Sequence, residues 1–206
     1  MNRLPKVTVI TVCRNALPLL RHTVENVLQQ AYAPLEYLII DGASTDGTPA
    51  YFSSLQAPLQ WWSEPDKGIY DAMNKGVARA SGEWVIFMNA GDCFAAADVL
   101  QRIFSTPRTA DVIYGDVLKA AADGAPTVSR AHPFKNAHRM CFCHQSSLVR
   151  IECLRATPFD ITHPFSADFK FFKLLGHQGK KFAYVDIPIA LFDTSGISNR
   201  QRSKGL

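Results

Sequence analysis

The segment Trp84–Asp92, WVIFMNAGD, begins as a buried strand and ends in polar residues. Its first five residues are apolar, as in a strand that is covered on both faces. Asn89 and Asp92 follow, with Gly91 between them. An Asx-type turn closed by Gly91 would explain Asn89 and Gly91, but it does not require Asp92. We therefore expect this strand to carry an amide and a carboxylate to a binding site at its carboxyl end.

The rest of the chain alternates between strand and helix patterns. Apolar runs predict strands at residues 7–12, 37–40, 59–63, 84–88 and 111–114. Apolar residues three or four positions apart predict helices around residues 20–28, 69–80 and 99–104. Strands that alternate with helices across short loops are typical of an α/β protein with parallel βαβ units. In such sheets ligands bind at the carboxyl ends of the strands.

The composition excludes several classes of protein. The 206 residues are 47% apolar and 19% charged, which excludes global disorder. The net charge of +4 is too small to indicate a nucleic-acid partner, and we expect none. No apolar run reaches the about 20 residues that span a bilayer, and the first residues lack a secretory signal. We expect a cytoplasmic protein with free thiols, and peripheral contact with the inner membrane surface stays open.

Polar side chains also follow the other predicted strands. Asp41 comes directly after an apolar run and would face the ligand crevice, where a carboxylate can accept hydrogen bonds from a ribose or a base. Lys67 stands at the start of the next predicted helix, where backbone N–H groups already favour an anion, so it predicts a phosphate contact. Asp71 and Asn74 lie on the polar side of that helix, for which a solvated surface is the alternative.

The end of the opening segment suits a divalent cation. Mg²⁺ and Mn²⁺ are often held by one or two carboxylates, with phosphates of a ligand and water completing the shell. We therefore predict a Mg²⁺ or Mn²⁺ site at Asp92, beside Asn89. The chain contains neither G-x-G-x-x-G nor G-x-x-x-x-G-K-[ST], which argues against a nicotinamide dehydrogenase and against a P-loop enzyme.

Four longer segments occur in a characteristic order: VTVITVCRNA (7–16), DGASTDGT (41–48), SEPDKGIYDAMNKGVARASGEWVIFMNAGD (63–92) and VIYGDV (112–117). Together they resemble the large inverting glycosyltransferase family 2 with the GT-A fold, in particular its bacterial members for capsule, exopolysaccharide and lipopolysaccharide synthesis, such as the colanic acid transferases. The resemblance is strong over about residues 6–118. It continues more loosely through CHQSSLVR (143–150), FDITHPFSADFKFF (159–172) and FDTSGISN (192–199).

The resemblance implies one GT-A domain over residues 1–206, with a mixed, mostly parallel sheet flanked by helices. About residues 1–118 would bind the nucleotide sugar, and about residues 119–206 would bind the acceptor. The segment NAGD would be the metal-binding segment, with Asn89 where the stricter D-x-D motif has aspartate. Asp92 would hold the metal, Asp41 would recognise the base, and the nucleotide-sugar set would comprise Thr11, Arg14, Asp41, Lys67, Asp71, Asn74, Asn89, Ala90 and Gly91.

An inverting transferase also needs a general base that takes the proton of the acceptor hydroxyl. In the family this is an aspartate at the start of a helix in the second half, and Asp168 matches it. The alternative is an acidic residue that the helix macrodipole favours at an N-terminus. His144, Ser195 and Gly196 are candidates for contact with the acceptor or the diphosphate, and a core histidine is the alternative for His144.

These implications predict a metal-dependent inverting glycosyltransferase. It would move a sugar from a nucleoside-diphosphate sugar, with UDP favoured over GDP, to a saccharide or lipid-linked saccharide in cell-surface polysaccharide synthesis. One alternative is a nucleotide-sugar-binding protein without transfer activity, which Asn89 in place of aspartate would allow. A sugar-phosphate nucleotidyltransferase shares the α/β pattern, but it needs a glycine-rich basic loop where this chain has TVCRNA (11–16).

Overall fold

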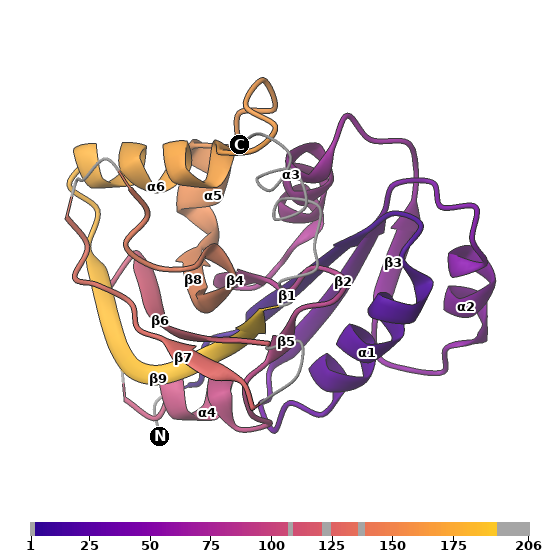
Figure 1. Cartoon of the computed structure of the whole chain (residues 1–206), viewed down its shortest axis with the longest axis horizontal. Helices are drawn as coiled ribbons and strands as arrows, with labels where there is room; N and C mark the ends of the chain where they lie inside the picture. The colour runs from indigo at the N-terminus through magenta and orange to yellow at the C-terminus, as the bar shows by residue number, and fades with distance from the viewer. Residues whose placement is uncertain (1–2, 107–108, 121–124, 136–138, 193–206) are drawn as a thin grey trace.

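A computed structural model describes residues 3–106, 109–120, 125–135 and 139–192, and it builds them around one nine-stranded sheet (Figure 1). The strand order is β3-β2-β1-β4-β8-β6-β9-β5, and β7 pairs with β6. The first four strands of this order are parallel. Their bounds are β1 (Val7–Cys13), β2 (Leu35–Asp41), β3 (Gln60–Ser63) and β4 (Trp84–Phe87). This half confirms the predicted α/β pattern.

Three helices follow strands of the first half, namely α1 (Leu17–Leu28), α2 (Thr48–Ser54) and α3 (Ile69–Arg79), and α4 (Val99–Ile103) comes later in the chain. Helices α1 and α3 cover opposite faces of the sheet, because successive strand residues point to opposite sides. Val9 shares a core cluster with Val24 of α1, whereas Ile10 shares the other with Met73 of α3. A Cβ at Gly76 would lie only 2.7 Å from Cγ2 of Ile10, so glycine lets α3 approach the sheet closely.

The second half mixes strand directions. It contains β5 (Cys93–Phe94), β6 (Val112–Lys119), β7 (Thr127–Ser129), β8 (Ser147–Arg150) and β9 (Phe182–Phe192). Strand β8 is antiparallel to both β4 and β6, while β9 is parallel to β6. The predicted strand at residues 111–114 is thus the start of the longer β6, and β8 separates it from β4.

The helical elements of the second half are the 3-10 turn η1 (His144–Ser146), α5 (Ile151–Ala156) and α6 (Ala167–His177). Helix α6 lies on the same face of the sheet as α3, since Phe171 and Met73 belong to one core cluster (Figure 1). Among the residues that the structure describes, no helix is both long and apolar enough to cross a membrane.

The carboxyl ends of β1 to β4 and of β6 lie along one edge of the sheet. The register pairs Cys13 with Asp41 and Asp41 with Ser63, so three strand ends stand side by side. Strand β6 has the same direction as β4, because both are antiparallel to β8. Its last residue, Lys119, therefore faces the same edge as Asn89, which follows β4.

Candidate active site

Asp41 lies at the carboxyl end of β2 and is fully buried, with 0% exposed. Its carboxylate accepts hydrogen bonds from the Ser63 hydroxyl (2.6 Å), the Ser44 backbone N–H (2.9 Å) and the Ser44 hydroxyl. Burial raises the pKa of the neighbouring Cys13 thiol, and the charge of Asp41 raises it further, so the thiol stays neutral. These bonds explain why Asp41 is held rigidly at the strand ends.

Two exposed cations stand near Asp41. A Cβ at Gly42 would overlap Oδ2 of Asp66 and would lie 3.3 Å from Cδ of Arg14, so both side chains close over the Gly42 backbone. Lys67 is exposed in the turn before α3, and its backbone N–H donates to Asp71 at 3.0 Å. This edge therefore presents the Arg14 and Lys67 charges, while Asp71 holds the turn.

Two residues of the predicted nucleotide-sugar set are engaged inside the protein. Thr11 is fully buried, and its hydroxyl donates to the Met88 carbonyl at 2.7 Å. The Asn74 amide donates to the Phe159 carbonyl at 2.8 Å and accepts from the Phe159 N–H at 3.0 Å. Asn74 thus ties α3 to the segment before α6, and both residues have structural partners where we predicted ligand contact.

The segment Asn89–Asp92 forms a tight turn after β4. The Asp92 N–H donates to the Asn89 carbonyl at 2.8 Å, and Gly91 has a φ of 105°, which favours glycine. The Thr23 hydroxyl accepts from the Gly91 N–H at 2.9 Å and donates to the Asp92 carbonyl at 2.9 Å. The Ala90 N–H donates to the Val12 carbonyl of β1 at 3.2 Å. This is a backbone turn closed by Gly91 and not the Asx-type turn considered above, because Oδ1 of Asn89 accepts no hydrogen bond from the described residues.

The donor set of this turn fits a hard cation. Oδ1 of Asn89 is buried and has no hydrogen-bond partner among the described residues, and Asp92 is 4% exposed. A carboxylate and an amide oxygen are ligands that Mg²⁺ and Mn²⁺ accept, with phosphate and water filling the other positions. Within the described part of the chain, no three His, Cys, Asp or Glu side chains form a cluster that could hold a metal alone.

Asp168 lies in the first turn of α6, where the helix dipole favours a carboxylate. The Tyr70 hydroxyl, from α3, donates to Oδ1 of Asp168 at 2.9 Å. Burial raises the pKa of Tyr70, and the negative charge of Asp168 raises it further, so the phenol remains a donor. Tyr70 therefore connects α3, the helix that follows the turn at Lys67, to the predicted base.

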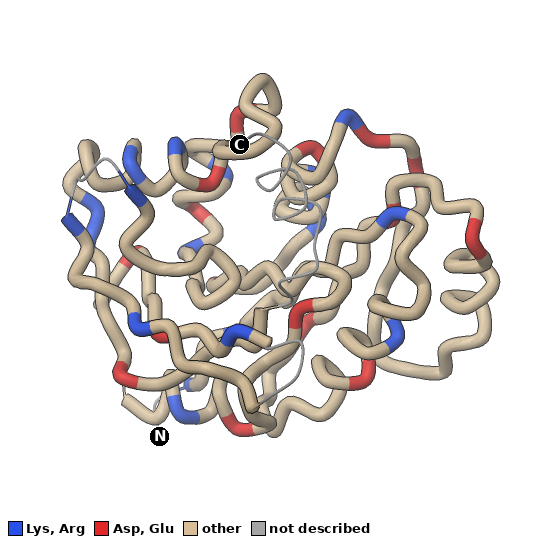
Figure 2. Tube along the Cα trace, in the orientation of Figure 1, with Lys and Arg blue, Asp and Glu red and all other residues tan. Residues whose placement is uncertain are grey.

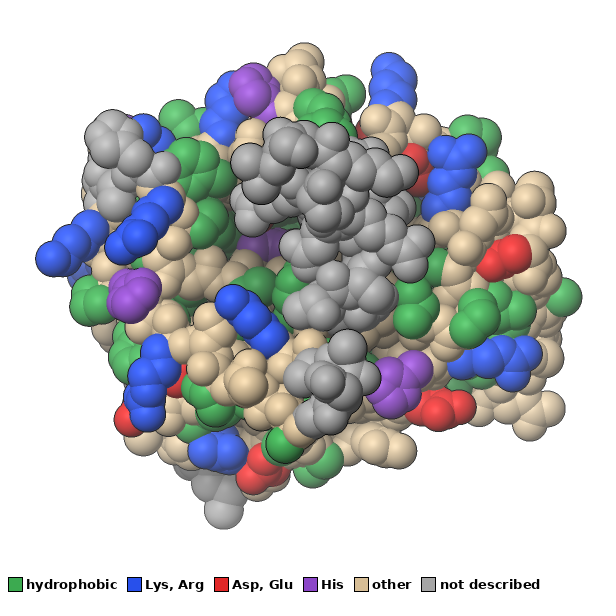
Figure 3. All heavy atoms as spheres, viewed as in Figure 1, with side chains coloured by type: hydrophobic (Ala, Val, Ile, Leu, Met, Phe, Trp, Pro, Cys, Tyr) green, Lys and Arg blue, Asp and Glu red, His purple; other side chains and the backbone are tan. Residues whose placement is uncertain are grey.

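Asp168 opens into a cleft of about 1260 Å³. The cleft lies between α6 and the strands β6 and β7, and Figure 3 shows a hollow in this face of the molecule. Asn89, His144 and Tyr70 line it together with Asp168. The structure thus brings together three predicted site residues, Asn89, His144 and Asp168, from distant parts of the chain.

His144 is only 8% exposed, and its ring lies 5.9 Å from the Phe87 ring. Burial lowers the pKa of His144, and the charge of Asp168 opposes this, so the imidazole is neutral near pH 7. Its Nε2 has no hydrogen-bond partner in the described part of the chain. A core histidine normally finds such a partner, so His144 stands ready for a ligand.

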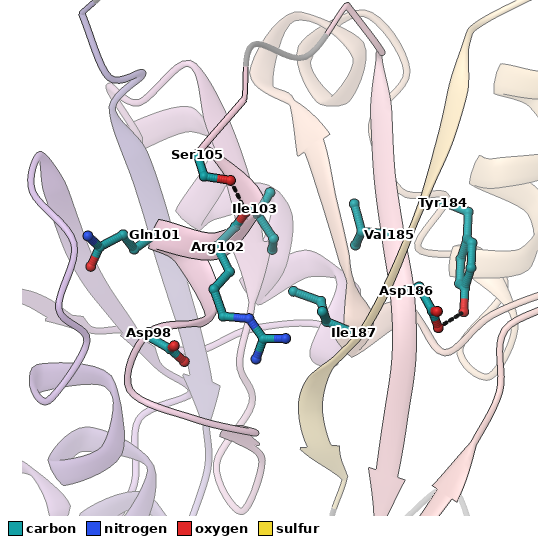
Figure 4. A pocket seen from close by; sticks show the side chains of 9 residues that line it. All are labelled: Asp98, Gln101, Arg102, Ile103, Ser105, Tyr184, Val185, Asp186 and Ile187. Atoms are coloured by element: carbon teal, nitrogen blue, oxygen red, sulfur yellow. Dashed lines mark hydrogen bonds between the residues drawn. The ribbon is translucent and has the colours of Figure 1, made fainter.

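A second pocket, of about 690 Å³, lies between α4 and β9 (Figure 4). Arg102, Asp98 and Asp186 are among the residues that line it. Its described lining contains none of the predicted site residues, so we take the first cleft as the candidate active site.

Sequence reasoning missed two polar residues of this region. Tyr70 was not among the candidate site residues, although its hydroxyl donates to Asp168. Asp116 is 97% buried within β6, where it accepts from the Ala131 N–H (2.9 Å) and the Tyr184 hydroxyl (3.0 Å). A lone carboxylate inside an apolar strand was the available signal. The predicted residues Ser195 and Gly196 lie outside the described residues.

The fold matches solved glycosyltransferases. Staphylococcus aureus TarS 1-349 in complex with UDP superposes with a TM-score of 0.77 and 16% identity, over 91% of this chain and 60% of that one. The mannosyltransferase PcManGT from Pyrobaculum calidifontis, in complex with GDP-Man and Mn²⁺, gives a TM-score of 0.72 and 20% identity, over 92% and 57% of the two chains. The chain therefore has the GT-A fold.

The sequence comparisons identify the family. The model of Glycosyl transferase family 2 matches residues 8–164, and the chain belongs to this family. A glycosyltransferase of Mycobacterium tuberculosis, named as uncharacterized, is 43% identical over 102 residues, which are 48% of this chain and 39% of that relative. The chain thus spans well under two thirds of the length of this relative and of both solved structures.

Proposed function

We propose that the chain is a metal-dependent inverting glycosyltransferase that uses a nucleoside-diphosphate sugar, with UDP favoured over GDP. The observation that carries the proposal is the cleft that joins Asn89, after β4, to Asp168, at the start of α6. A donor at the strand ends and an acceptor in this cleft would meet beside a carboxylate. Single displacement needs this arrangement, because a base must stand on the acceptor side of the anomeric carbon.

The nucleotide is assigned to the edge around Asp41, Arg14 and Lys67. The two exposed cations suit a diphosphate, and the start of α3 adds backbone N–H groups. The UDP in the TarS structure and the GDP-Man in the mannosyltransferase structure support a nucleotide-sugar donor on this fold. We leave Thr11 and Asn74 out of the donor set and assign Asp41 to fixing the loops at this edge, because the side chains of all three are bonded within the protein.

Asp92 is assigned to Mg²⁺ or Mn²⁺, with Asn89 beside it. When bound, such a cation neutralises charge on the departing diphosphate. The Mn²⁺ in the mannosyltransferase structure supports this assignment. The contribution of the chain is a turn that Thr23 holds in place, so that both oxygen ligands are oriented before the donor arrives.

Asp168 is assigned as the general base. It takes the proton of the acceptor hydroxyl as that oxygen attacks the anomeric carbon, while the bond to the diphosphate breaks on the opposite face and the configuration inverts. Tyr70 holds Oδ1 of the base by its hydrogen bond of 2.9 Å. His144 is assigned to the acceptor, because this residue lines the same cleft and its buried Nε2 has no hydrogen-bond partner among the described residues.

The resemblance supports the remaining assignments. The acceptor would be a saccharide or a lipid-linked saccharide, and the product would enter a cell-surface polysaccharide of the capsule or exopolysaccharide kind. The reaction would take place in the cytoplasm or at the inner membrane surface.

The variant Asp168→Asn tests the base, with Asp98→Asn as the matched control on the exposed N-terminal side of α4. Release of UDP from a panel of UDP-sugars is measured with and without saccharide acceptors. We expect Asp168→Asn to lose acceptor-dependent turnover by about 100-fold or more, because a general base contributes 10²–10⁴. Its affinity for UDP should stay within about twofold of the parent, as in the control.

Transfer by folded Asp168→Asn at the parent rate would sink the assignment. A parent protein that binds UDP-sugars but never turns them over, with any acceptor, would favour the binding protein without transfer activity.

A further inference from the structure

The charges that line the cleft are unequal. Its described lining includes three cationic side chains, Lys119, Arg130 and Arg139, and a single carboxylate, that of Asp168. Figure 2 shows basic positions on α6 and on the strands that face it. A neutral saccharide does not require this excess of positive charge.

The three cations that line the cleft come from separate segments. Lys119 ends β6, and Arg130 directly follows β7, which pairs with β6. Arg139 belongs to the segment before η1. This segment is bonded to the stretch that follows β7, because the His132 N–H donates to the Cys141 carbonyl at 2.7 Å. Lys119 and Arg130 therefore lie on the β6–β7 side of the cleft, and Arg139 joins the lining from the segment before η1, where it also lies beside α6 residues such as Phe169 and Phe172.

Within the described part of the chain, two of the three charges lack a counter-ion. Arg130 lies 3.3 Å from Asp186 and 3.9 Å from Asp116. Lys119 and Arg139 form no ion pair with any described residue. Burial raises the pKa of the Cys143 thiol to about 12, and the charge of Lys119 opposes that rise, so Lys119 acts on a residue inside the cleft.

An independent observation indicates that the cleft receives a polar ligand. His144 is more than nine-tenths buried, it lines the cleft, and its Nε2 is unpartnered within the described residues. A buried ring nitrogen without a partner destabilises the protein, and a polar group of a ligand would satisfy it. The cleft also has an apolar lip, where Phe165 is 65% exposed.

We propose that this cleft, in its role as the acceptor site of the proposed transferase, binds an acceptor that carries a phosphate or carboxylate group, held by Lys119 and Arg139. Arginine and lysine bind such oxyanions through charge-assisted hydrogen bonds, and arginine matches their geometry with two parallel donors. That the bound anion is the sugar acceptor rests on the proposed function. That the cleft binds an anion rests only on its cationic side chains.

The site adjoins the one assigned to the donor diphosphate, since Asn89 lines the cleft, but its cationic side chains are different ones. Arg14 and Lys67 come from the loops after β1 and β3, and neither is among the described residues that line the cleft. Lys119 and Arg139 come from the second half of the chain. An anion that competes with UDP and an anion that binds beside UDP are therefore distinguishable.

Calorimetry on the whole chain, saturated with UDP and Mn²⁺, tests the proposal. The anionic probes are geranyl diphosphate, which stands for a lipid-linked diphosphate, and trigalacturonic acid, which stands for an acidic saccharide. Geraniol and maltotriose are their neutral counterparts. The variants are Lys119→Gln, Arg139→Gln and the double variant, and Lys181→Gln is the control, because Lys181 precedes β9 at the opposite end of the β6–β9 pair.

We expect at least one anionic probe to bind the UDP-loaded parent, and the double variant to lose about tenfold or more in affinity for it. The double variant should keep the UDP affinity of the parent, and Lys181→Gln should bind the anionic probe as the parent does. Each neutral probe should bind the parent more weakly than its anionic counterpart. Binding of geranyl diphosphate alone assigns a lipid-linked phosphate, and binding of trigalacturonic acid alone assigns an acidic saccharide.

The proposal is overturned if neither anion binds the loaded protein, or if the double variant binds them as the parent does. If UDP itself does not bind, the proposed function fails, and the same titrations without UDP then decide the anion site alone.

Discussion

The variant Asn74→Ala separates a structural role of this residue from the nucleotide contact that its sequence position suggested. The Asn74 amide bonds both backbone groups of Phe159, at 2.8 and 3.0 Å. Phe159 is buried in the core beneath α6, so this residue fastens the acceptor half to α3. Alanine removes both bonds and leaves a backbone N–H and C=O without partners.

The expected loss follows from these two bonds. A buried group left unsatisfied costs about 1–3 kcal/mol, and Asn74 itself is half-buried, which reduces the penalty. We therefore expect Asn74→Ala to lower the free energy of unfolding by about 2 to 4 kcal/mol. For a chain of this size, each kcal/mol shifts the Tm by about 2–4 °C, so the Tm should fall by about 4 to 16 °C.

Thermal unfolding followed by circular dichroism measures this loss. The matched control is Gln101→Ala, which removes an exposed amide from α4 and should change stability by less than about 0.5 kcal/mol. A Tm for Asn74→Ala within about 2 °C of the parent, combined with weaker UDP binding, would refute the structural role and restore the nucleotide contact.

Three further predictions concern the donor edge, the base and the pH dependence of stability. Gly42→Ala should weaken UDP binding several-fold in calorimetry, because its Cβ would overlap Asp66; unchanged binding would contradict this. Tyr70→Phe should slow transfer about tenfold or more at unchanged UDP affinity, because it removes a charge-assisted bond worth about 1.5–3 kcal/mol; a parent-like rate would exclude a positioning role. Burial tends to raise the pKa of Glu36, but hydrogen bonds outweigh it and hold the pKa at about 2. The carboxylate therefore stabilises the fold above about pH 4.5, and this contribution is lost as the pH falls towards 2. Denaturant titrations from pH 6 to 2 should show a smaller loss of unfolding free energy in Glu36→Gln than in the parent. Equal losses in the two proteins would contradict the low pKa of Glu36.

Sequence patterns predicted the first half of the fold well. Strands β1, β2 and β4 are buried on both faces, so their apolar runs stand out, and α3 shows its apolar face at helical spacing. The second half was less readable. Strand β8 is only four residues long, and it pairs with β4 across more than sixty positions of sequence, which no local pattern reveals.

The candidate site shows the same contrast. Asn89 and Asp92 were predicted from their place after a strand, whereas the turn that holds them is closed by backbone bonds and Gly91, and not by the Asn89 side chain. Thr11 and Asn74 have partners 77 and 85 residues away, so a polar residue near a strand end could not be assigned to the core or to a ligand. Asp168 was reached only through the family resemblance, and its contact with Tyr70 spans 98 residues.

The most direct test of the central claim is binding of UDP, measured by calorimetry with and without Mn²⁺, on the parent and on Asp92→Ala. The account predicts that UDP binds the parent, that Mn²⁺ strengthens the binding, and that the variant loses this gain while it keeps the binding seen without metal. Absence of UDP binding under both conditions would contradict the uridine donor. A gain from Mn²⁺ that survives in Asp92→Ala would contradict the metal site at the end of β4.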